Sequence, residues 1–353
     1  MTLLSRSTVE PELVTVECDV CFPQHIATTT IGELVDRGWM LRLRGEPHDM
    51  CNMCRFEPFQ GQTPRVDRAP AVTPDSGHLP NFFIIGAAKA GTTSLHFYLD
   101  QHPDVFMAEM KELHYFCDPD FERWESLYRE QFPVDAKARG EGSTLYTRSP
   151  AIPGVPGRIA AKVRDARLIY LVRDPVERAL ASWREERFHV TERRPAEVAF
   201  AHPEDPHNAY VAASRYAEQL DGYREHFPAD RILVLDQREL ATDTATVVAR
   251  VIEFLGLPAY EIDTETRYNE GSTKLEYGGL GHRLRFSAPA RAVRRMPAPV
   301  RTAVIAPARR LLRKPVPTPD LPADLMARLE DVLRPDAARL RDMTGLELAH
   351  WSI

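Results

Sequence analysis

Residues 81–95 read N-F-F-I-I-G-A-A-K-A-G-T-T-S-L, and the interpretation of the whole chain starts from this stretch. The apolar run 82–85 predicts a buried strand, which Gly86 ends. The run that begins at Leu95 has the apolar spacing of a helix. A strand, a glycine loop and a helix start form a cradle for phosphate, because the first amides of a helix lack partners and its dipole favours an anion there.

The order of residues in this loop separates it from a Walker A loop. A Walker A loop places its lysine directly after the second glycine, as G-x-x-x-x-G-K-[ST]. Here Lys89 comes before Gly91, and three hydroxyl residues follow Gly91. The structural alternative is a plain glycine turn between a strand and a helix.

K-A-G-T-T-S-L after a strand resembles the 5′-phosphosulfate loop of sulfotransferases that use 3′-phosphoadenosine 5′-phosphosulfate (PAPS). The resemblance runs over residues 79–353 and is to bacterial members and the heparan-sulfate-type sulfotransferase domain. It implies that Lys89 neutralises charge on the leaving bridging oxygen. It also implies that the 5′-phosphate is bound by the backbone amides and hydroxyls of one short run: Ala90, Gly91, Thr92, Thr93 and Ser94.

Residues 111–116, K-E-L-H-Y-F, resemble the K-E-x-H-F-F stretch that holds the acidic catalytic residue of this family. Sulfuryl transfer to a hydroxyl needs a base that takes the hydroxyl proton. Glu112 is the expected base, and we expect its aromatic and apolar neighbours to raise its pKa. His114 is the alternative, since cytosolic small-molecule sulfotransferases use a histidine. For either residue, the structural alternative is a polar loop at the surface.

A second motif follows the strand predicted over residues 167–172. The sequence R-D-P-V-E-R at 173–178 resembles the family's 3′-phosphate site. Arg173 ends the strand and Pro175 suits the first position of a helix, so a guanidinium there can bind phosphate through paired hydrogen bonds. Lys89 and Arg173 would then bind opposite ends of one nucleotide.

Two further contacts to the cofactor depart from the family pattern. The family usually has a serine eight residues after the arginine, where this chain has Ala181. Ser182 is the candidate for that contact, although one residue turns a helix by about 100°. Lys274 is a loose match to the late basic loop that covers the cofactor in relatives.

Residues 140–146, G-E-G-S-T-L-Y, resemble the family's G-E-x-S/T-x-x-Y stretch on the acceptor side. By this resemblance Glu141 and Ser143 would bind acceptor hydroxyls. Packing at the end of a strand is an equal alternative.

The first 60 residues predict a small zinc-ribbon-like unit. Cys18 and Cys21 form one C-x-x-C pair, and Cys51 and Cys54 form a second about thirty residues later. Such paired cysteines are typical of a structural, tetrahedral Zn²⁺ site. Four free thiols in a loop-rich arm are the alternative. The unit would also offer a surface for a protein partner.

Composition narrows the class of protein. The formal net charge of −6 gives no reason to expect a nucleic-acid partner. No apolar run reaches the roughly 18 residues of a membrane span, and residues 1–12 lack the apolar segment of a signal peptide, so we expect a cytoplasmic protein. Residues 61–78, rich in Pro, Gly, Ser, Thr and Asp, read as a linker before the main domain at 79–353.

Strands that alternate with helices predict an α/β fold: a mostly parallel P-loop-type sheet with helices on both faces, plus the N-terminal unit. The predicted function is sulfuryl transfer from PAPS to an acceptor hydroxyl on a carbohydrate, lipid or secondary metabolite. One rival is a P-loop kinase or NTPase, for which the G-K-[ST] order is missing and Asp236 is a weak magnesium ligand. The other is a non-enzymatic zinc-ribbon adaptor, against which Lys89, Arg173 and Glu112 argue.

Overall fold

The computed structural model describes residues 77–189, 192, 194–264 and 319–353, together with the backbone of five short strands outside these ranges. Three of the short strands form an antiparallel sheet in the order β1-β2-β3: Thr2–Arg6, Leu13–Glu17 and Ile26–Thr30. The other two, β9 (Leu275–Tyr277) and β10 (Arg313–Pro315), pair antiparallel with each other.

A five-stranded parallel sheet forms the centre of the main domain, with the strand order β5-β6-β4-β7-β8. Its strands are β4 (Phe82–Gly86), β5 (Val105–Met107), β6 (Ala138–Gly142), β7 (Arg167–Val172) and β8 (Ile232–Asp236). Every residue of β4 is buried, as expected for the middle strand of a covered parallel sheet. The strands predicted over 82–85 and 167–172 are confirmed.

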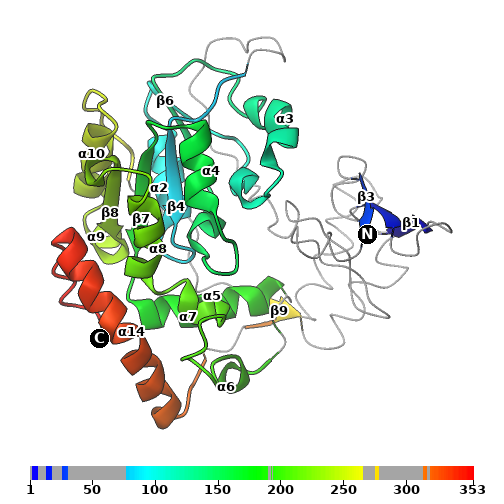
Figure 1. Ribbon diagram of the computed structural model, residues 1–353. Helices are drawn as coiled ribbons and strands as arrows, with labels where there is room; N and C mark the ends of the chain where they lie inside the picture. Colours follow the sequence, from blue (N-terminus) through cyan, green and yellow to red (C-terminus); the bar gives the residue numbers. More distant parts are fainter. Residues whose placement is uncertain are drawn as a thin grey trace.

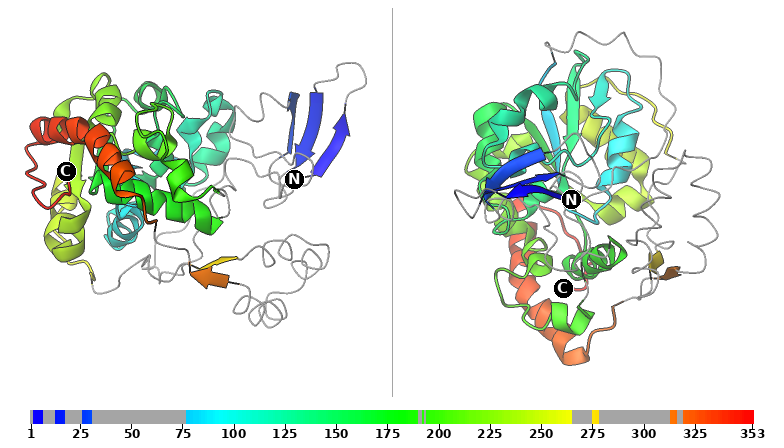
Figure 2. Two further views of the ribbon diagram at one scale, coloured as in Figure 1. Left: turned by 90° about the horizontal axis from the view of Figure 1, so that it is seen from below. Right: turned by 90° about the vertical axis from the view of Figure 1, so that its right-hand side faces the viewer.

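Helices lie on both faces of this sheet (Figures 1 and 2). On one face α2 (Thr92–Leu99) contacts α10 (Thr244–Phe254), and on the other α4 (Val155–Lys162) contacts α8 (Tyr216–Arg224). The long helix α14 (Ala323–Thr344) packs against α8 and α5 (Pro175–His189). The remaining short helices are η2 (Tyr115–Cys117), η3 (Phe121–Trp124), α3 (Glu125–Arg129), η4 (Thr144–Thr147), α6 (Ala196–Ala199), α7 (Ala209–Ala212), η5 (Ala229–Arg231) and α9 (Gln237–Thr242).

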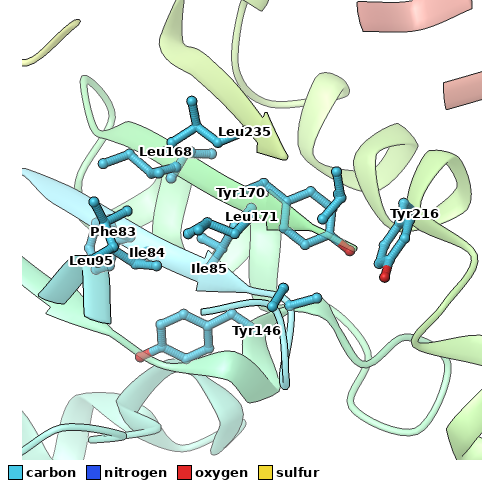
Figure 3. Close-up of a cluster of buried hydrophobic side chains, with 14 of the residues drawn as sticks. Phe83, Ile84, Ile85, Leu95, Tyr146, Leu168, Tyr170, Leu171, Tyr216 and Leu235 are labelled. Carbon is cyan, nitrogen blue, oxygen red and sulfur yellow. The ribbon is translucent and has the colours of Figure 1, made fainter. Parts of the chain in front are cut away.

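The core is formed by apolar side chains of neighbouring strands and of the segments that cross over them (Figure 3). Phe83 of β4 packs edge-on against Phe116 and Tyr146, with ring centroids 5.7 and 6.4 Å apart. Each such buried aromatic or aliphatic side chain contributes about 1.5–3 kcal/mol to stability. The same rings hold the loop after β5 against the loop after β6, and both loops belong to the candidate site.

A break in the chain separates two helices that precede β8. α7 ends at Ala212 and α8 begins at Tyr216. Ser214 in the break donates to the carbonyl of Pro175 at 2.8 Å. Asp336 of α14 accepts from the backbone amides of Ala217 and Glu218 at 3.0 and 2.9 Å, and so caps the start of α8.

Within the described part of the chain, no helix has both the length and the apolar character needed to cross a membrane. The cytoplasmic location stays a prediction.

Candidate active site

The phosphate loop connects β4 to α2. Gly86 and Gly91 have φ of 151° and 90°, and a side chain at Gly86 would begin 2.2 Å from the Thr147 hydroxyl, so this backbone path requires glycine. Gly91 precedes α2 and supplies no side-chain cap. The start of a helix without a side-chain cap suits an anion. Ala90 differs from the prediction, because its amide donates within the loop to the carbonyl of Ala87 at 3.1 Å.

Lys89 and Arg173 lie side by side, because β4 and β7 are neighbouring parallel strands that end at the same edge of the sheet. The Nη1 atom of Arg173 lies 3.5 Å from the backbone carbonyl oxygen of Lys89. The side chain of Lys89 donates to Glu185 of α5 at 3.0 Å, and Arg173 donates to Glu177 at 2.7 and 3.1 Å. The two residues lie at the same edge of the sheet, and their binding to one nucleotide stays a prediction.

The backbone of Arg173 is fixed from a different direction by a tyrosine. The Tyr216 hydroxyl donates to the Arg173 carbonyl at 2.8 Å and lies 3.4 Å from the Arg173 amide nitrogen. Tyr216 is buried beside Tyr170, and Trp351 from the C-terminal residues packs near its ring at 5.8 Å (Figure 3). The backbone of Arg173 is therefore held by different groups from its guanidinium, which pairs with Glu177.

Glu112 lies at the other side of the loop, within reach of α2. Its Oε2 accepts from the Thr144 amide at 2.7 Å and the Thr144 hydroxyl at 3.1 Å, and its Oε1 pairs with Lys111. Lys111 Nζ also lies 3.4 Å from the hydroxyl of Thr92, the first residue of α2. Lys111 thus connects the expected base to the start of the phosphate-binding helix.

The electrostatics of Glu112 correct one expectation. Burial alone would raise the pKa of Glu112, but the Lys111 ammonium, His114 and the hydrogen bonds to Lys111 and Thr144 together hold that pKa below its usual value. The prediction of a raised pKa is therefore wrong for the protein without ligands. That prediction was based on the apolar neighbours of Glu112 alone, whereas the adjacent Lys111 ammonium lowers the pKa.

His114 is buried, with its Nε2 atom 3.8 Å from Oε2 of Glu112. It does not lie at the surface, so the polar-loop alternative fails for this residue. His96 of α2 is a second buried histidine near Lys111, and burial, followed by the Lys111 charge, lowers its pKa to about 3. His96 is therefore neutral at physiological pH.

Glu141 and Ser143 do not line a surface that an acceptor can reach. Both side chains are fully buried, with 0% exposure, and the Ser143 hydroxyl donates a hydrogen bond to Glu141 at 2.5 Å. Burial raises the pKa of Glu141 to about 7, although hydrogen bonds from Ser143, Tyr128 and Tyr146 oppose the rise. The structure favours the alternative of packing at the strand end over contact with acceptor hydroxyls.

Of the remaining predicted residues, only Ser182 lies in the described part of the chain. Ser182 is 2% exposed and lies on the buried face of α5, whereas Ala181 and Glu185 share the more open face that Lys89 contacts. Lys274 lies outside the described residues, as do the four paired cysteines, Cys18, Cys21, Cys51 and Cys54. Within the described ranges, no group of three or more His, Cys, Asp or Glu side chains is arranged to hold a metal.

Sequence reasoning gave no role to three residues that the structure places in the site: Lys111, Thr144 and Glu185. Lys111 could have been found from its position next to Glu112. Thr144 and Glu185 are 32 and 96 residues away from their partners in the sequence, so no local pattern reveals them.

The site so described is an anion cradle with the cationic side chains of Lys89, Arg173 and Lys111 and an adjacent carboxylate. Residues 79–273 match the family described as Sulfotransferase domain. Human heparan sulfate glucosamine 3-O-sulfotransferase 6 is 30% identical over 283 residues, covering 77% of this chain and 74% of the relative. Bovine bifunctional heparan sulfate N-deacetylase/N-sulfotransferase 2 is 28% identical over 212 residues, covering 54% and 24%. A sulfotransferase structure from Alicyclobacillus acidocaldarius has a TM-score of 0.56 and 25% identity, covering 78% of this chain and 100% of that chain.

The chain therefore belongs to the sulfotransferase family, and its main domain is a sulfotransferase domain. The chain spans about a quarter of the length of the bifunctional relatives that it matches.

Proposed function

We propose that this protein transfers the sulfuryl group of PAPS to a hydroxyl of an acceptor, with the described site as its active site. The observation that carries the proposal is the placement of Lys89, Arg173 and Lys111 around the start of α2. A nucleotide with phosphate groups at both its 3′ and 5′ positions needs cations at two places, and this edge of the sheet supplies them. We also propose that residues 1–60 form the zinc-ribbon-like unit, residues 61–78 the linker and residues 79–353 the sulfotransferase domain.

Each residue has a defined role in this proposal. The amides of residues 91–94 and the hydroxyls of Thr92 and Thr93 bind the 5′-phosphate, and Arg173 turns from Glu177 to bind the 3′-phosphate. Lys89 leaves Glu185 and neutralises the bridging oxygen as its bond to sulfur breaks. Ser182 and Lys274 remain secondary candidates for cofactor contacts.

Glu112 takes the proton of the acceptor hydroxyl while the new sulfur–oxygen bond forms, and 3′-phosphoadenosine 5′-phosphate leaves. The lowered pKa keeps Glu112 ionised, as a base must be before reaction. Lys111 can meet negative charge on the transferred group, because it lies between Thr92 and Glu112. When Lys111 turns to that group, Glu112 loses the partner that lowers its pKa and becomes the stronger base. His114 is the alternative base.

The acceptor class is drawn from the relatives' names. Two of the relatives are named for sulfation of heparan sulfate, at a glucosamine oxygen in one and at nitrogen in the other. We therefore propose a sugar hydroxyl as the first candidate acceptor, with a sugar amine, a lipid alcohol or a secondary metabolite as the others.

The test is transfer of radiolabelled sulfate from PAPS to a panel of these acceptors, beside turnover of magnesium–ATP. Labelled product with at least one acceptor and no ATP turnover is the expected result. Magnesium-dependent ATP hydrolysis, with no measurable binding of 3′-phosphoadenosine 5′-phosphate, would favour the kinase or NTPase rival and overturn the proposal.

We also propose a structural Zn²⁺ held by Cys18, Cys21, Cys51 and Cys54, supported by the type and spacing of the donors. Purified full-length protein should contain about one zinc ion per chain, and Cys18→Ser should lose it. The matched control is Cys117→Ser, which changes the one cysteine outside the two pairs. If Cys18→Ser sulfates a free acceptor normally and loses no bound protein, the unit does not recruit a partner.

A further inference from the structure

The segment that carries Glu112 and His114 has an unfavourable backbone. Both residues adopt positive φ, at 63° and 55°, and neither is a glycine. Such conformations persist only where the surroundings fix them, and they concentrate at functional sites.

Two backbone amides of the segment are held by hydroxyls from the loop after β6. The His114 amide donates to the Ser143 hydroxyl at 3.0 Å, and the Phe116 amide donates to the Tyr146 hydroxyl at 3.3 Å. Each hydroxyl in turn donates to the same oxygen, Oε1 of Glu141, at 2.5 and 2.6 Å. One buried carboxyl group is therefore connected to the segment through two separate hydrogen-bonded links.

The direction of these bonds requires a group that accepts hydrogen bonds at position 141. A hydroxyl has one hydrogen, and a hydroxyl that accepts from an amide must direct this hydrogen elsewhere. The carboxylate of Glu141 receives it in both links, while its other oxygen receives the Tyr128 hydroxyl. Glutamine would keep the shape, but its amide group would replace one of the two accepting oxygens with a donor.

A fully buried carboxyl group is unfavourable unless its hydrogen bonds offset the loss of water. Glu141 is 0% exposed, and no salt bridge to it is found among the described residues. Its raised pKa agrees with that burial. If position 141 served only to pack the end of β6, an apolar side chain would do so without the cost of burying a carboxyl group.

We infer that Glu141 is a positioning residue for sulfuryl transfer, which holds the Glu112–His114 segment in its reactive geometry through Ser143 and Tyr146. The inference rests on the proposed function, because it gives this segment a part in the reaction. Glu141 does not contact the acceptor or the nucleotide. Its effect reaches the reaction through the backbone of the segment, and a small displacement of a catalytic group lowers the rate strongly.

Two tyrosines provide a matched pair for the test. Tyr146→Phe and Tyr128→Phe each remove one hydroxyl from Glu141 and keep the ring, but only the Tyr146 hydroxyl reaches an amide of the segment. We expect Tyr146→Phe to lower kcat roughly tenfold and Tyr128→Phe to change it less than about twofold. In both variants the KM for PAPS and the affinity for 3′-phosphoadenosine 5′-phosphate should stay unchanged, which also shows that the variants fold. Equal effects of the two substitutions on kcat, or no effect of Tyr146→Phe, would overturn the inference.

Ser143→Ala removes the other link and should lower kcat in the same way. Glu112→Gln, measured in parallel, separates this inference from the proposed base. If Glu112→Gln keeps full activity while the tyrosines differ as expected, the proposed base is wrong but the positioning role stands. If Glu112→Gln is inactive and the tyrosines behave alike, the base stands and the positioning role is refuted.

Discussion

The two halves of the candidate site are held in different ways. On the nucleotide side, Lys89 and Arg173 follow neighbouring strands, and their side chains pair with partly exposed carboxylates that they can leave. On the base side, Glu112 and His114 sit in a loop with positive φ that is tied to β6 and its following loop by buried hydrogen bonds. Groups that must move to a ligand therefore have partly exposed partners, while groups that must hold one geometry have buried ones.

The largest expected effect is on the base side. Glu112→Gln should lower kcat about 10²–10⁴-fold, because the amide cannot take the acceptor proton. Steady-state transfer from labelled PAPS measures this, and the affinity for 3′-phosphoadenosine 5′-phosphate should remain. Glu109→Gln is the control, since Glu109 is exposed on the same segment. A Glu112→Gln variant with the full rate would transfer the role of base to His114.

The stability of the base side should depend on pH through Glu141. Its pKa is about 7 in the folded protein against 4.5 ordinarily, so between these values the folded state binds more protons than the unfolded state. The free energy of unfolding should therefore fall as pH rises from about 4.5 to about 7, by on the order of 3 kcal/mol from this group.

Denaturant unfolding of wild type and Glu141→Gln at several pH values measures this contribution, because the substitution removes the Glu141 carboxyl and leaves the other titratable groups in place. The difference in stability between the two proteins should change steadily across the range. A constant difference would mean that the Glu141 carboxyl keeps an ordinary pKa.

On the nucleotide side, Arg173→Ala should weaken binding of 3′-phosphoadenosine 5′-phosphate by roughly 10- to 100-fold, the value of hydrogen bonds to a charged group. Calorimetry measures the affinity. Glu177→Ala removes the partner of Arg173 in the free protein and should leave the affinity equal or higher. A loss of affinity in Glu177→Ala as large as in Arg173→Ala would contradict the view of a releasable partner.

The smallest expected effect concerns the backbone of Arg173. Tyr216→Phe removes the hydroxyl that bonds the Arg173 carbonyl and should weaken nucleotide binding by about fivefold, the value of one hydrogen bond. Tyr170→Phe is the matched control, because Tyr170 packs beside Tyr216 (Figure 3) and makes no hydrogen bond to the Arg173 backbone among the described residues. Equal affinities of the two variants would mean that the Arg173 backbone needs no support from Tyr216.

Much of the nucleotide side could be predicted from the sequence. The apolar runs of β4 and β7 have the length of buried strands, Gly91 marks the start of α2, and Pro175 begins α5. These signals are local, since each depends on residues within one turn or strand. Such local signals did not place Ser182 correctly. Ser182 lies one residue after the family's serine position, and one residue on a helix moves a side chain to a different face.

On the base side, the sequence identified the candidate residues but not the direction in which their pKa values shift. The motif identified Glu112 and His114, yet the direction of the pKa shift of Glu112 depends on the geometry of Lys111 and Thr144. Likewise the acceptor role expected for Glu141 fails because the hydroxyls of Tyr128 and Tyr146 enclose it.

The parallel α/β fold, the phosphate loop and the order of the two cofactor motifs follow from the chain's local patterns, because hydrophobic period and glycine placement act over a few residues. Which groups meet depends on the folded arrangement: Lys111 contacts Thr92, Asp336 caps the start of α8, and Glu141 is linked to the segment of the base. Burial and charge pairing join residues that are distant in the chain, so they exist only after the sheet has brought its strands together.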